Sequence, residues 1–432
     1  MSFKVAPFGS LFSAPQKNGL TRPKKARGSG LPMVNMGELF AHPRIHNLNM
    51  DLVPVEDSEN HFLLEPEDLL FARQSLVLAG AGQCSIFVRN NLPTVFESHL
   101  IRCRLNKSVS NPYFYFFRSP VGRTAIETIA EQGAGASGIR GSDLVKLHVP
   151  CPPKSIQDQV ALVLTSLDDR IALLSETNAT LEAIAQALFK SWFVDFDPVR
   201  AKQEGRAPEG MDEATAAMFP DRFDESELGL VPIGWRVGTL GDIAKTVRRQ
   251  IQPSELRATL HYVGLEHIPR KSLSLTNWGN AGGLESAKAC FAKGDVLFGK
   301  LRPYFHKVVI APFDGVCSTD ILVCQSIEKQ FLGVVAMHLF SVPLVEYADR
   351  LSNGAKMPRV NWQDLAAYPI CVPPQRLAGV FSDSIAPLIS RMETSTHQAQ
   401  TLATLRDTLL PRLISGQLRL PADAALLEEF AA

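Results

Sequence analysis

Basic side chains alternate with amide and aromatic side chains in short segments of this sequence. One segment is residues 299–307, GKLRPYFHK, and Arg248, Arg249 and Gln250 form a second group. Arginine and glutamine can make paired hydrogen bonds to the edges of guanine and adenine, and lysine suits phosphate oxygens. A third group, in residues 17–27, mixes basic residues with Pro and Gly and is typical of a mobile loop. These residue types favour binding of nucleic acid.

The candidate DNA-contacting residues lie in these three segments, at Arg73 and in residues 354–359. They are Lys17, Arg22, Lys24, Lys25, Arg27, Arg73, Arg248, Arg249, Gln250, Lys300, Arg302, Tyr304, His306, Lys307, Lys356 and Arg359. A single basic residue is more often just a solvated surface group. Only the loop from Lys300 to Lys307, which follows a predicted strand, favours DNA contact over that simpler interpretation.

Motifs for catalysis are missing from the sequence. It contains no G-x-x-x-x-G-K-[ST], no H-E-x-x-H and no G-x-S-x-G. The string Gly133-x-Gly135-x-x-Gly138 matches a dinucleotide fingerprint, but it follows a helix-like stretch where that site needs a strand. Base methylation would need a polar–Pro–Pro–aromatic loop, and Asp197-Pro198-Val199-Arg200 has one proline and no aromatic residue. We therefore expect no catalytic residue and no metal site in this chain.

Composition and cysteine usage indicate a folded cytoplasmic protein. Hydrophobic residues make up 45% and charged residues 20% of the 432 residues, which is ordinary for soluble domains. With neither a secretion signal nor an apolar run of membrane-spanning length, we expect a cytoplasmic location and no contact with membranes. The seven cysteines are scattered without a C-x-x-C pair, which favours free thiols in a reducing compartment.

The net charge is zero, which argues against DNA binding because phosphate contact needs positive charge. The charges are unevenly distributed, however. Residues 1–150 contain 16 Lys and Arg against 12 Asp and Glu, and residues 229–372 contain 16 against 11. Residues 201–228 contain 3 against 8. Two mildly basic blocks therefore flank an acidic connector, a pattern that many enzymes share and that is only weak support for DNA binding.

An internal repeat organises the chain. Residues 143–153 and 364–374 both read Asp-Leu, mixed residues, an apolar pair and Pro-Pro, at an offset of 221. This offset continues for about 60 residues with apolar type preserved. Upstream the similarity has gaps: Phe3 matches Trp235 at offset 232, and residues 68–71 match 295–298 at offset 227. Residues 96–98 resemble 316–318 at offset 220.

The part of each copy with constant offset is predicted to be helical. Apolar residues recur at steps of three and four, as on the contact face of a coiled coil. The predicted seam residues are Leu167, Ile171, Leu174, Leu181, Leu188, Leu388, Met392, Leu402 and Leu409. Pro387 predicts a break in the second copy and Ser166 the matching break in the first, which leaves long helices of about 27 residues, or about 40 Å. Asn178 lies on this seam and is either a register-setting residue or a tolerated edge residue.

The two blocks are predicted to be α+β, with short strands and turns at 36–72, 96–104, 113–118, 295–298, 308–311 and 321–324 and helices at 121–131 and 331–351. The predicted organisation is a recognition domain at 1–150, a helical spacer at 151–200, an acidic connector at 201–228, a second recognition domain at 229–372, a helical spacer at 373–420 and a tail at 421–432. The alternative is a single large domain that contains core helices.

The sequence resembles the specificity subunits of type I restriction–modification systems. The resemblance is carried by the order of several segments over essentially the whole chain rather than by one diagnostic motif. These segments are Gly205–Met211, Gly234–Gly241, Gly294–Leu297, Lys300–Tyr304, Cys317–Asp320, Asp364-Leu365, the two Pro-Pro junctions and Leu410–Gly416. The first block departs from the pattern, because Ala72–Ser75 stands where Gly299–Arg302 stands in the second; Arg73 is the best candidate there.

The resemblance implies two similar target-recognition domains separated by two long antiparallel helical segments. It also implies a noncatalytic subunit that reads two half-sites of double-stranded DNA and docks two methylation subunits, with restriction subunits joining the complex. S-adenosylmethionine, ATP and Mg would be used by those partner subunits, and this chain would hold no cofactor. Two alternatives stay open: a methyltransferase or nuclease with an unrecognised site, and a coiled-coil adaptor that binds only proteins.

Overall fold

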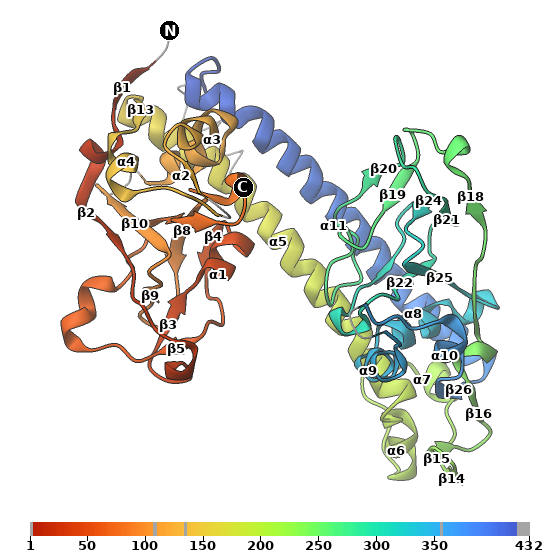
Figure 1. The fold of residues 1–432 in the computed structure, drawn as a ribbon. Helices are drawn as coiled ribbons and strands as arrows, with labels where there is room; N and C mark the ends of the chain where they lie inside the picture. The colour runs from red at the N-terminus through yellow and green to blue at the C-terminus, as the bar shows by residue number, and fades with distance from the viewer. Residues whose placement is uncertain (1–2, 107–109, 134–135, 355–356, 421–432) are drawn as a thin grey trace. The chain divides into compact units, whose positions relative to one another are not determined.

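The chain folds into two compact units that share two long helices. The structure, a computed structural model, describes residues 3–106, 110–133, 136–354 and 357–420 (Figure 1). Unit 1 comprises Met1–Arg170 with Thr401–Ala432, and unit 2 comprises Ile171–Gln400. Each unit mixes sheets and helices around its own core, which confirms the predicted α+β class with two similar units and excludes a single merged core.

Unit 1 is built on a five-stranded sheet in the order β2-β10-β6-β8-β4, in which only β4 and β8 run parallel. Two helices, α2 and α3, follow β10 along the chain. The elements are β1 Lys4–Pro7, β2 Phe12–Asn18, β3 Leu31–Val34, α1 Met36–Ala41, β4 Arg44–His46, β5 Leu52–Val53, β6 Leu69–Ala72, β7 Gln74–Ser75, β8 Cys84–Arg89, β9 Val95–Phe96, β10 Leu100–Leu105, α2 Ser110–Arg118, α3 Pro120–Glu127, β11 Glu131–Gly133, β12 Ala136–Gly138, α4 Gly141–Lys146 and β13 His148–Cys151.

Unit 2 has a four-stranded sheet, β17-β25-β22-β23, and a five-stranded sheet, β18-β21-β24-β19-β20. The helices α8 and α9 follow β25, as α2 and α3 follow β10. The elements are α6 Asp197–Gln203, α7 Glu213–Ala216, β14 Phe223–Ser226, β15 Gly229–Pro232, β16 Arg236–Thr239, β17 Ala244–Thr246, β18 Gln250–Ile251, β19 His261–Val263, β20 Gly279–Asn280, β21 Lys288–Phe291, β22 Val296–Gly299, β23 Val308–Ile310, β24 Gly315–Cys317, β25 Ile321–Ser326, α8 Leu332–Phe340, α9 Val342–Leu351, α10 Trp362–Ala366 and β26 Pro369–Val372.

The strands of the two units pair in the same register. In unit 1, β1 pairs with β13 and places Lys4 opposite Cys151; in unit 2, β16 pairs with β26 and places Arg236 opposite Val372. These partners differ by 232 and 221, the offsets that the sequence repeat predicts. The central strands agree as well: the register Ala72–Leu100 of β6 and β10 returns as Gly299–Ile321 of β22 and β25.

One predicted offset is wrong by one residue. The sequence aligned Phe96 with Val316, at offset 220, whereas the structure pairs Val34 with Phe96 and Val263 with Cys317 in two matching parallel strand pairs. The structural offset is therefore 221, as in the rest of that half of the repeat. Side-chain type misled the alignment because both Val316 and Cys317 are buried.

Each long helix is continuous. Helix α5 spans Lys154–Phe193 and α11 spans Gln375–Ser415 (Figure 1). The predicted breaks near Ser166 and Pro387 are therefore wrong. The Ser166 hydroxyl donates to the Leu162 carbonyl at 2.8 Å within the helix. Pro387 lies on an exposed face, where water can solvate the carbonyl that lacks an N–H partner.

The two long helices pack against each other in antiparallel fashion. Within unit 2, Phe193 near the end of α5 contacts Phe381 near the start of α11, with ring centroids 4.9 Å apart. Of the predicted seam residues, Leu174 and Met392 are buried, and the other seven are half-buried: Leu167, Ile171, Leu181, Leu188, Leu388, Leu402 and Leu409. In unit 1, Leu410 and Leu413 belong to the same hydrophobic cluster as Val160 and Leu164.

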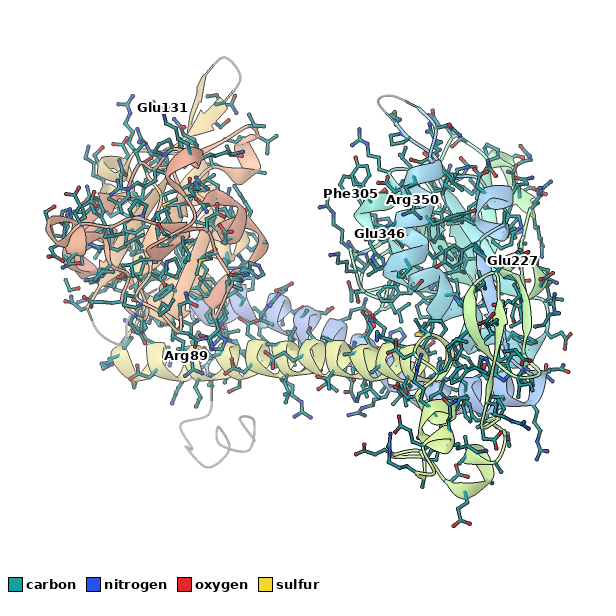
Figure 2. All side chains as sticks on the ribbon, turned by 90° about the horizontal axis from the view of Figure 1, so that it is seen from below. Arg89, Glu131, Glu227, Phe305, Glu346 and Arg350 are labelled. Atoms are coloured by element: carbon teal, nitrogen blue, oxygen red, sulfur yellow. The ribbon has the colours of Figure 1, made fainter. Side chains whose placement is uncertain are left out.

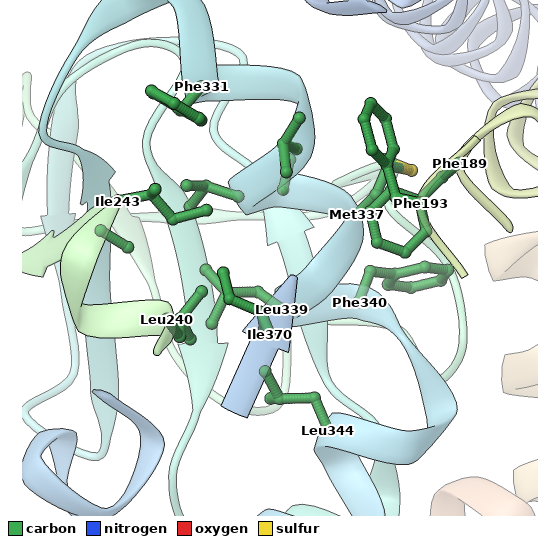
Figure 3. Packing of buried hydrophobic residues seen from close by; sticks show 14 of the residues in the cluster. Phe189, Phe193, Leu240, Ile243, Phe331, Met337, Leu339, Phe340, Leu344 and Ile370 are labelled. Carbon is green, nitrogen blue, oxygen red and sulfur yellow. The ribbon is translucent and has the colours of Figure 1, made fainter. Parts of the chain in front are cut away.

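The core of unit 2 joins the sheet, α8 and the long helices. Figure 3 shows Phe189 and Phe193 of α5 beside Met337 and Phe340 of α8, and all four belong to one buried cluster. Trp192 and Trp235 extend that cluster through an edge-to-face and a tilted ring contact, respectively, with Phe219. The α+β block of unit 2 is therefore built directly onto the helical pair.

One segment differs from the sequence-based expectation. Residues 113–118, predicted as strand from their aromatic and β-favouring side chains, lie in α2; tertiary packing of five buried aromatic rings overrides that local preference. The segment predicted as the acidic connector, 201–228, contains regular elements. It contains α7 and β14, and its Phe219 is buried.

Among the described residues, no single helix is long and apolar enough to cross a membrane. One bent helix pair, residues 329–340 with 342–351, has the required length and apolar composition when its two helices are counted together.

Candidate nucleic-acid interface

Unit 2 carries an open groove with a volume of about 480 Å³, lined by both polar and apolar side chains. Five segments that are separate in the sequence line it, and four of the predicted DNA-contacting residues meet there. The lining residues are Thr246, Val247, Arg248, Gln250, Ala289, Lys300, Thr319, Ile321, Leu322, Val323, Arg359, Val360, Asn361, Trp362 and Gln363.

The ends of neighbouring strands place the basic residues of this groove. Arg248 and Gln250 follow β17, an edge strand that pairs with β25, and both side chains are exposed. Lys300 comes directly after β22, the neighbour of β25 on its other side. Its backbone N–H donates to the Asp320 carbonyl at 3.0 Å, and its own carbonyl accepts from Val360 N–H at 3.1 Å. The sheet thus brings three distant segments to one edge.

Arg359 is held by an ion pair inside the groove. Its Nε donates to Asp320 Oδ1 at 2.9 Å, and Nη2 lies 3.5 Å from Oδ2. The hydrogen bond to Asp320 raises the pKa of Arg359 above its ordinary value. The N-terminus of α10 lies beside it, where Asn361 caps the helix by accepting from Asp364 N–H at 2.9 Å. The groove therefore offers cationic and amide donors to an anionic or hydrogen-bond-accepting ligand.

The chain is similar to known proteins of one family. Residues 11–183 match the model of the type I restriction modification DNA specificity domain. The MjaIX specificity subunit of a type I restriction enzyme from Methanocaldococcus jannaschii is 25% identical over 323 residues, which cover 72% of this chain and 69% of that protein. The HindI specificity subunit from Haemophilus influenzae is 23% identical and covers 89% of this chain and 94% of that protein.

The chain is similar to the specificity subunits of type I restriction–modification systems. The crystal structure of an S subunit from M. genitalium has the same fold, with a TM-score of 0.54, 15% identity and 96% coverage of both chains. The family accounts for a role in DNA recognition within a multisubunit system, and the resemblance seen in the sequence is confirmed.

The loop from Lys300 to Lys307 of this specificity subunit contributes less surface than its sequence suggests. His306 is 5% exposed, and its ring lies 2.8 Å from the Phe340 carbonyl oxygen. Burial lowers the pKa of His306, so the ring is neutral. Lys307 is half-buried and donates to the Leu265 carbonyl. A DNA contact by His306 does not agree with this position, because only 5% of the residue is exposed.

The remaining unit 2 candidates lie outside the groove lining. Tyr304 is half exposed, Arg302 is half-buried and Arg249 is exposed. Phe305, next to Tyr304, lies on the surface near α9 (Figure 2) and packs under the Arg270 guanidinium at 4.0 Å. Lys356 lies outside the described residues, and nothing is assigned to it.

In unit 1 the predicted residues lie on separate elements. Lys17, on β2, packs over the Phe62 ring at 5.2 Å. Arg22 pairs with Glu59, and Arg27 pairs with Asp51 at 2.6 Å. Lys24 and Lys25 are exposed, and Arg73 is half-buried after β6. Ion pairs thus occupy two of the arginines that were expected in a mobile basic loop, and the DNA contacts of unit 1 remain predictions.

Arg73 occupies the position in unit 1 that Lys300 occupies in unit 2. Its N–H donates to the His99 carbonyl at 2.8 Å, and its carbonyl accepts from Ile139 N–H at 2.9 Å. By the same hydrogen bonds, His99 corresponds to Asp320 and Gly138 to Arg359. The ion pair of the unit 2 groove therefore has no equivalent at these positions of unit 1.

Sequence reasoning missed the polar residues that complete the groove. Asp320 was noted only as part of a family string, and Asn361, Trp362 and Gln363 were not singled out. The constant offset of 221 carried the signal that could have found them. It places Asn361 of unit 2 at the position that Arg140 occupies in unit 1, beside Arg73. Reading polar residues through the repeat would have found them.

The thiols and carboxylates of the described residues form no evident reactive centre. All seven cysteines are free, and burial raises the pKa of Cys371 to about 11, which keeps that thiol protonated at neutral pH. Among residues that the structure describes, no group of three His, Cys, Asp or Glu side chains could hold a metal ion.

Proposed function

We propose that this specificity subunit reads a bipartite duplex target, with one short half-site recognised by each unit. The observation that carries the proposal is the groove in unit 2, where Arg248, Gln250, Lys300 and Arg359 meet on a scaffold whose strand register recurs in unit 1. Arginine and glutamine supply base-edge contacts, and lysine supplies phosphate contact. The predicted residues of unit 1, with Arg73 foremost, would serve the other half-site.

The long helices would set the spacing between half-sites. A helix rises about 1.5 Å per residue, so seven added residues lengthen it by about 10 Å, close to three base pairs at about 3.4 Å each. Inserting one heptad within residues 167–188 of α5, with a matching heptad in α11 to keep the seam paired, should lengthen the spacer and leave both half-sites unchanged. Mapping of methylated sites in cells with the complete system measures this. Altered half-sites, or an unaltered spacer, would contradict the ruler role.

The helices would also dock the methylation subunits. Three large apolar side chains are exposed on α5: Leu162 at 42%, Leu173 at 52% and Ile184 at 44%. They are spaced by eleven residues, which is close to three helical turns, so they form one stripe along the helix. An exposed apolar stripe indicates a protein partner. We infer two methylation subunits on the helices of this chain, with restriction subunits joining the complex.

Catalysis and its cofactors would belong to the partner subunits. S-adenosylmethionine, ATP and Mg would bind there, and this chain would act only in recognition. Incubation of the isolated chain with DNA and S-adenosylmethionine or Mg should give no turnover, whereas methylation or cleavage would favour the rival hypothesis of an enzyme. Sequence-selective, salt-sensitive DNA binding by the reconstituted complex is expected, and its absence would favour a purely protein-binding adaptor.

A further inference from the structure

The backbone of Arg359 is fixed on both sides. Its N–H donates to the Asn353 carbonyl at 2.9 Å, and its carbonyl accepts from Asn353 N–H at 3.0 Å. The flanking residues are also bonded: Pro358 O accepts from Arg302 N–H at 2.8 Å, and Val360 N–H donates to Lys300 O at 3.1 Å. The Cα of Arg359 is therefore placed in the groove without help from a ligand.

Asp320 fixes the side chain as well. Its carboxylate faces the Nε and Nη2 atoms of Arg359, which form one edge of the guanidinium. Asp320 is itself positioned, because its N–H donates to Ser318 Oγ at 3.2 Å and its carbonyl accepts from Lys300 N–H. The two side chains are 45% and 28% exposed, so the pair remains accessible from solvent. The opposite edge of the guanidinium, formed by Nη1 and the second hydrogen of Nη2, still has donors to offer.

We propose that this second edge of Arg359, buttressed by Asp320, reads a guanine in the half-site of unit 2. The inference rests on the proposed function and deepens it. Guanine presents O6 and N7 as two adjacent acceptors in the major groove, and the end of an arginine matches them with two donors. Because Asp320 holds the other edge, little side-chain freedom remains to be lost on binding.

The carboxylate favours a base over a phosphate as the ligand. Asp320 neutralises much of the charge of Arg359 and would repel a phosphate placed beside it, because like charges at short range cost energy. A guanine edge carries no net charge and needs hydrogen-bond geometry instead. Lys300, whose ammonium group acts as a compact point charge, suits phosphate better.

Unit 1 offers a built-in contrast. His99 and Gly138 stand at the positions of Asp320 and Arg359, so this particular contact cannot form there. The guanine requirement attributed to Arg359 should therefore appear in one half-site only. Any effect of changing the pair should be confined to that half-site.

The test is the methylation motif of cells that carry the complete system with wild-type or variant subunit. The variants are Arg359→Ala, Arg359→Lys and Asp320→Asn, with Arg350→Ala as control. Arg350 lies on α9 (Figure 2), with its guanidinium over the Tyr347 ring and outside the groove lining. A motif that contains no defined half-sites with the wild-type subunit would contradict the proposed function itself.

With a defined wild-type motif, Arg359→Ala and Arg359→Lys should relax one guanine position in one half-site. The preference for guanine there should fall by about 10- to 100-fold, the range of one good two-donor base contact. Asp320→Asn should weaken the same preference by a smaller factor, and the control should keep the wild-type motif. If Arg359→Ala prevents folding, the two milder variants decide.

Two results would overturn the inference and leave the proposed function standing. One is an unchanged motif in all three variants. The other is a uniform loss of methylation across all bases and both half-sites in Arg359→Lys and Asp320→Asn, as expected for a phosphate contact or for a purely structural ion pair. Competition binding of the purified complex with duplexes substituted at the guanine position provides the second measurement.

Discussion

The side-chain amide nitrogen of Asn178 on α5 lies 3.1 Å from the hydroxyl oxygen of Thr396 on α11 and 3.2 Å from the Met392 carbonyl oxygen. Asn178 and Thr396 are buried in a seam that is otherwise mostly apolar. Each hydrogen bond connects one helix to the other, and a shift of one residue along the seam would break both. Asn178 therefore contributes to the register of the helical pair.

Replacing Asn178 by Leu should stabilise the subunit. Thr396 Oγ1 also donates to Met392 O at 2.8 Å, so no partner is left without a hydrogen bond, and Asn178 Oδ1 already has no partner among the described residues. We expect the free energy of unfolding to rise by about 1 kcal/mol, while spacer length in the methylation motif becomes less uniform. Urea titration and motif mapping measure the two effects. Thr180→Leu, at an exposed position of α5, is the control; a clear loss of stability in Asn178→Leu would contradict the expectation.

Glu182 should make unit 2 less stable as the pH rises above the ordinary pKa of a glutamate side chain. It is buried on α5 and accepts from Leu273 N–H at 2.7 Å and from Ser272 Oγ at 3.2 Å. Burial raises the pKa of Glu182 above the ordinary value of a glutamate despite these two hydrogen bonds. The folded state thus holds a proton more tightly than the unfolded state, and its stabilising effect is lost as pH rises from about 4.5 through the raised pKa.

The measurement is the stability difference between wild type and Glu182→Gln from pH 4 to pH 8. This difference should decline with rising pH and then level off, because the neutral amide has no charge to bury. Taking the difference cancels the contribution that other titrating groups, such as His338, make to the pH dependence of stability. Burial lowers the pKa of His338 to about 4, so its contribution changes with pH in the opposite direction. A difference that stays flat across this range would show that Glu182 does not titrate there.

Removing Asp168 should destabilise unit 1. Asp168 Oδ2 accepts from the Tyr115 hydroxyl at 2.7 Å, and Oδ1 lies 2.6 Å from Nη1 of Arg406 on α11. Asp168→Ala leaves a buried hydroxyl and a mostly buried guanidinium without this partner, so we expect a loss of about 2–3 kcal/mol. Asp168→Asn keeps an acceptor for Tyr115 and should lose less. Hydrogen exchange should show faster opening of α2 and little change in the sheets of unit 2; equal loosening in both units would contradict a local role.

Charges on the exposed face of α5 should block partner docking. Leu173→Asp and Ile184→Asp place a carboxylate in the apolar stripe, and each should weaken binding of the methylation subunit by about 10-fold or more. Their melting temperatures should stay close to wild type, because both side chains are exposed. Ser175→Asp, on another face of the same helix, is the control. Unchanged affinity in both stripe variants, measured by calorimetry, would place the interface elsewhere.

The repeat made much of the fold predictable from the sequence. Apolar periodicity located both long helices, and the constant offset anticipated the shared register at Cys151 and Val372. The continuity of α11 through Pro387 was not predictable from the sequence. Whether a helix tolerates a proline depends on whether the carbonyl that loses its N–H partner faces water. Residues 113–118 were mistaken for a strand because local β preference says nothing of the helix packing that tertiary contacts impose.

The groove was only partly predictable. Basic residue types pointed to Arg248, Lys300 and Arg359, yet their convergence depends on the order of strands in a sheet. The burial of His306, which is 5% exposed, is invisible in a single sequence. The contact between Asp320 and Arg359 joins residues 39 positions apart, which no local pattern reveals.

Leu410 and Leu413 complete the hydrophobic cluster of unit 1 although they are translated after all of unit 2. During synthesis on the ribosome, the residues of unit 2 are available as one continuous stretch, whereas unit 1 must wait for the far end of the nascent chain. The first unit to be translated is therefore the last to be finished. Premature termination near residue 400 would leave unit 1 exposed to proteases and chaperones while unit 2 keeps its own core.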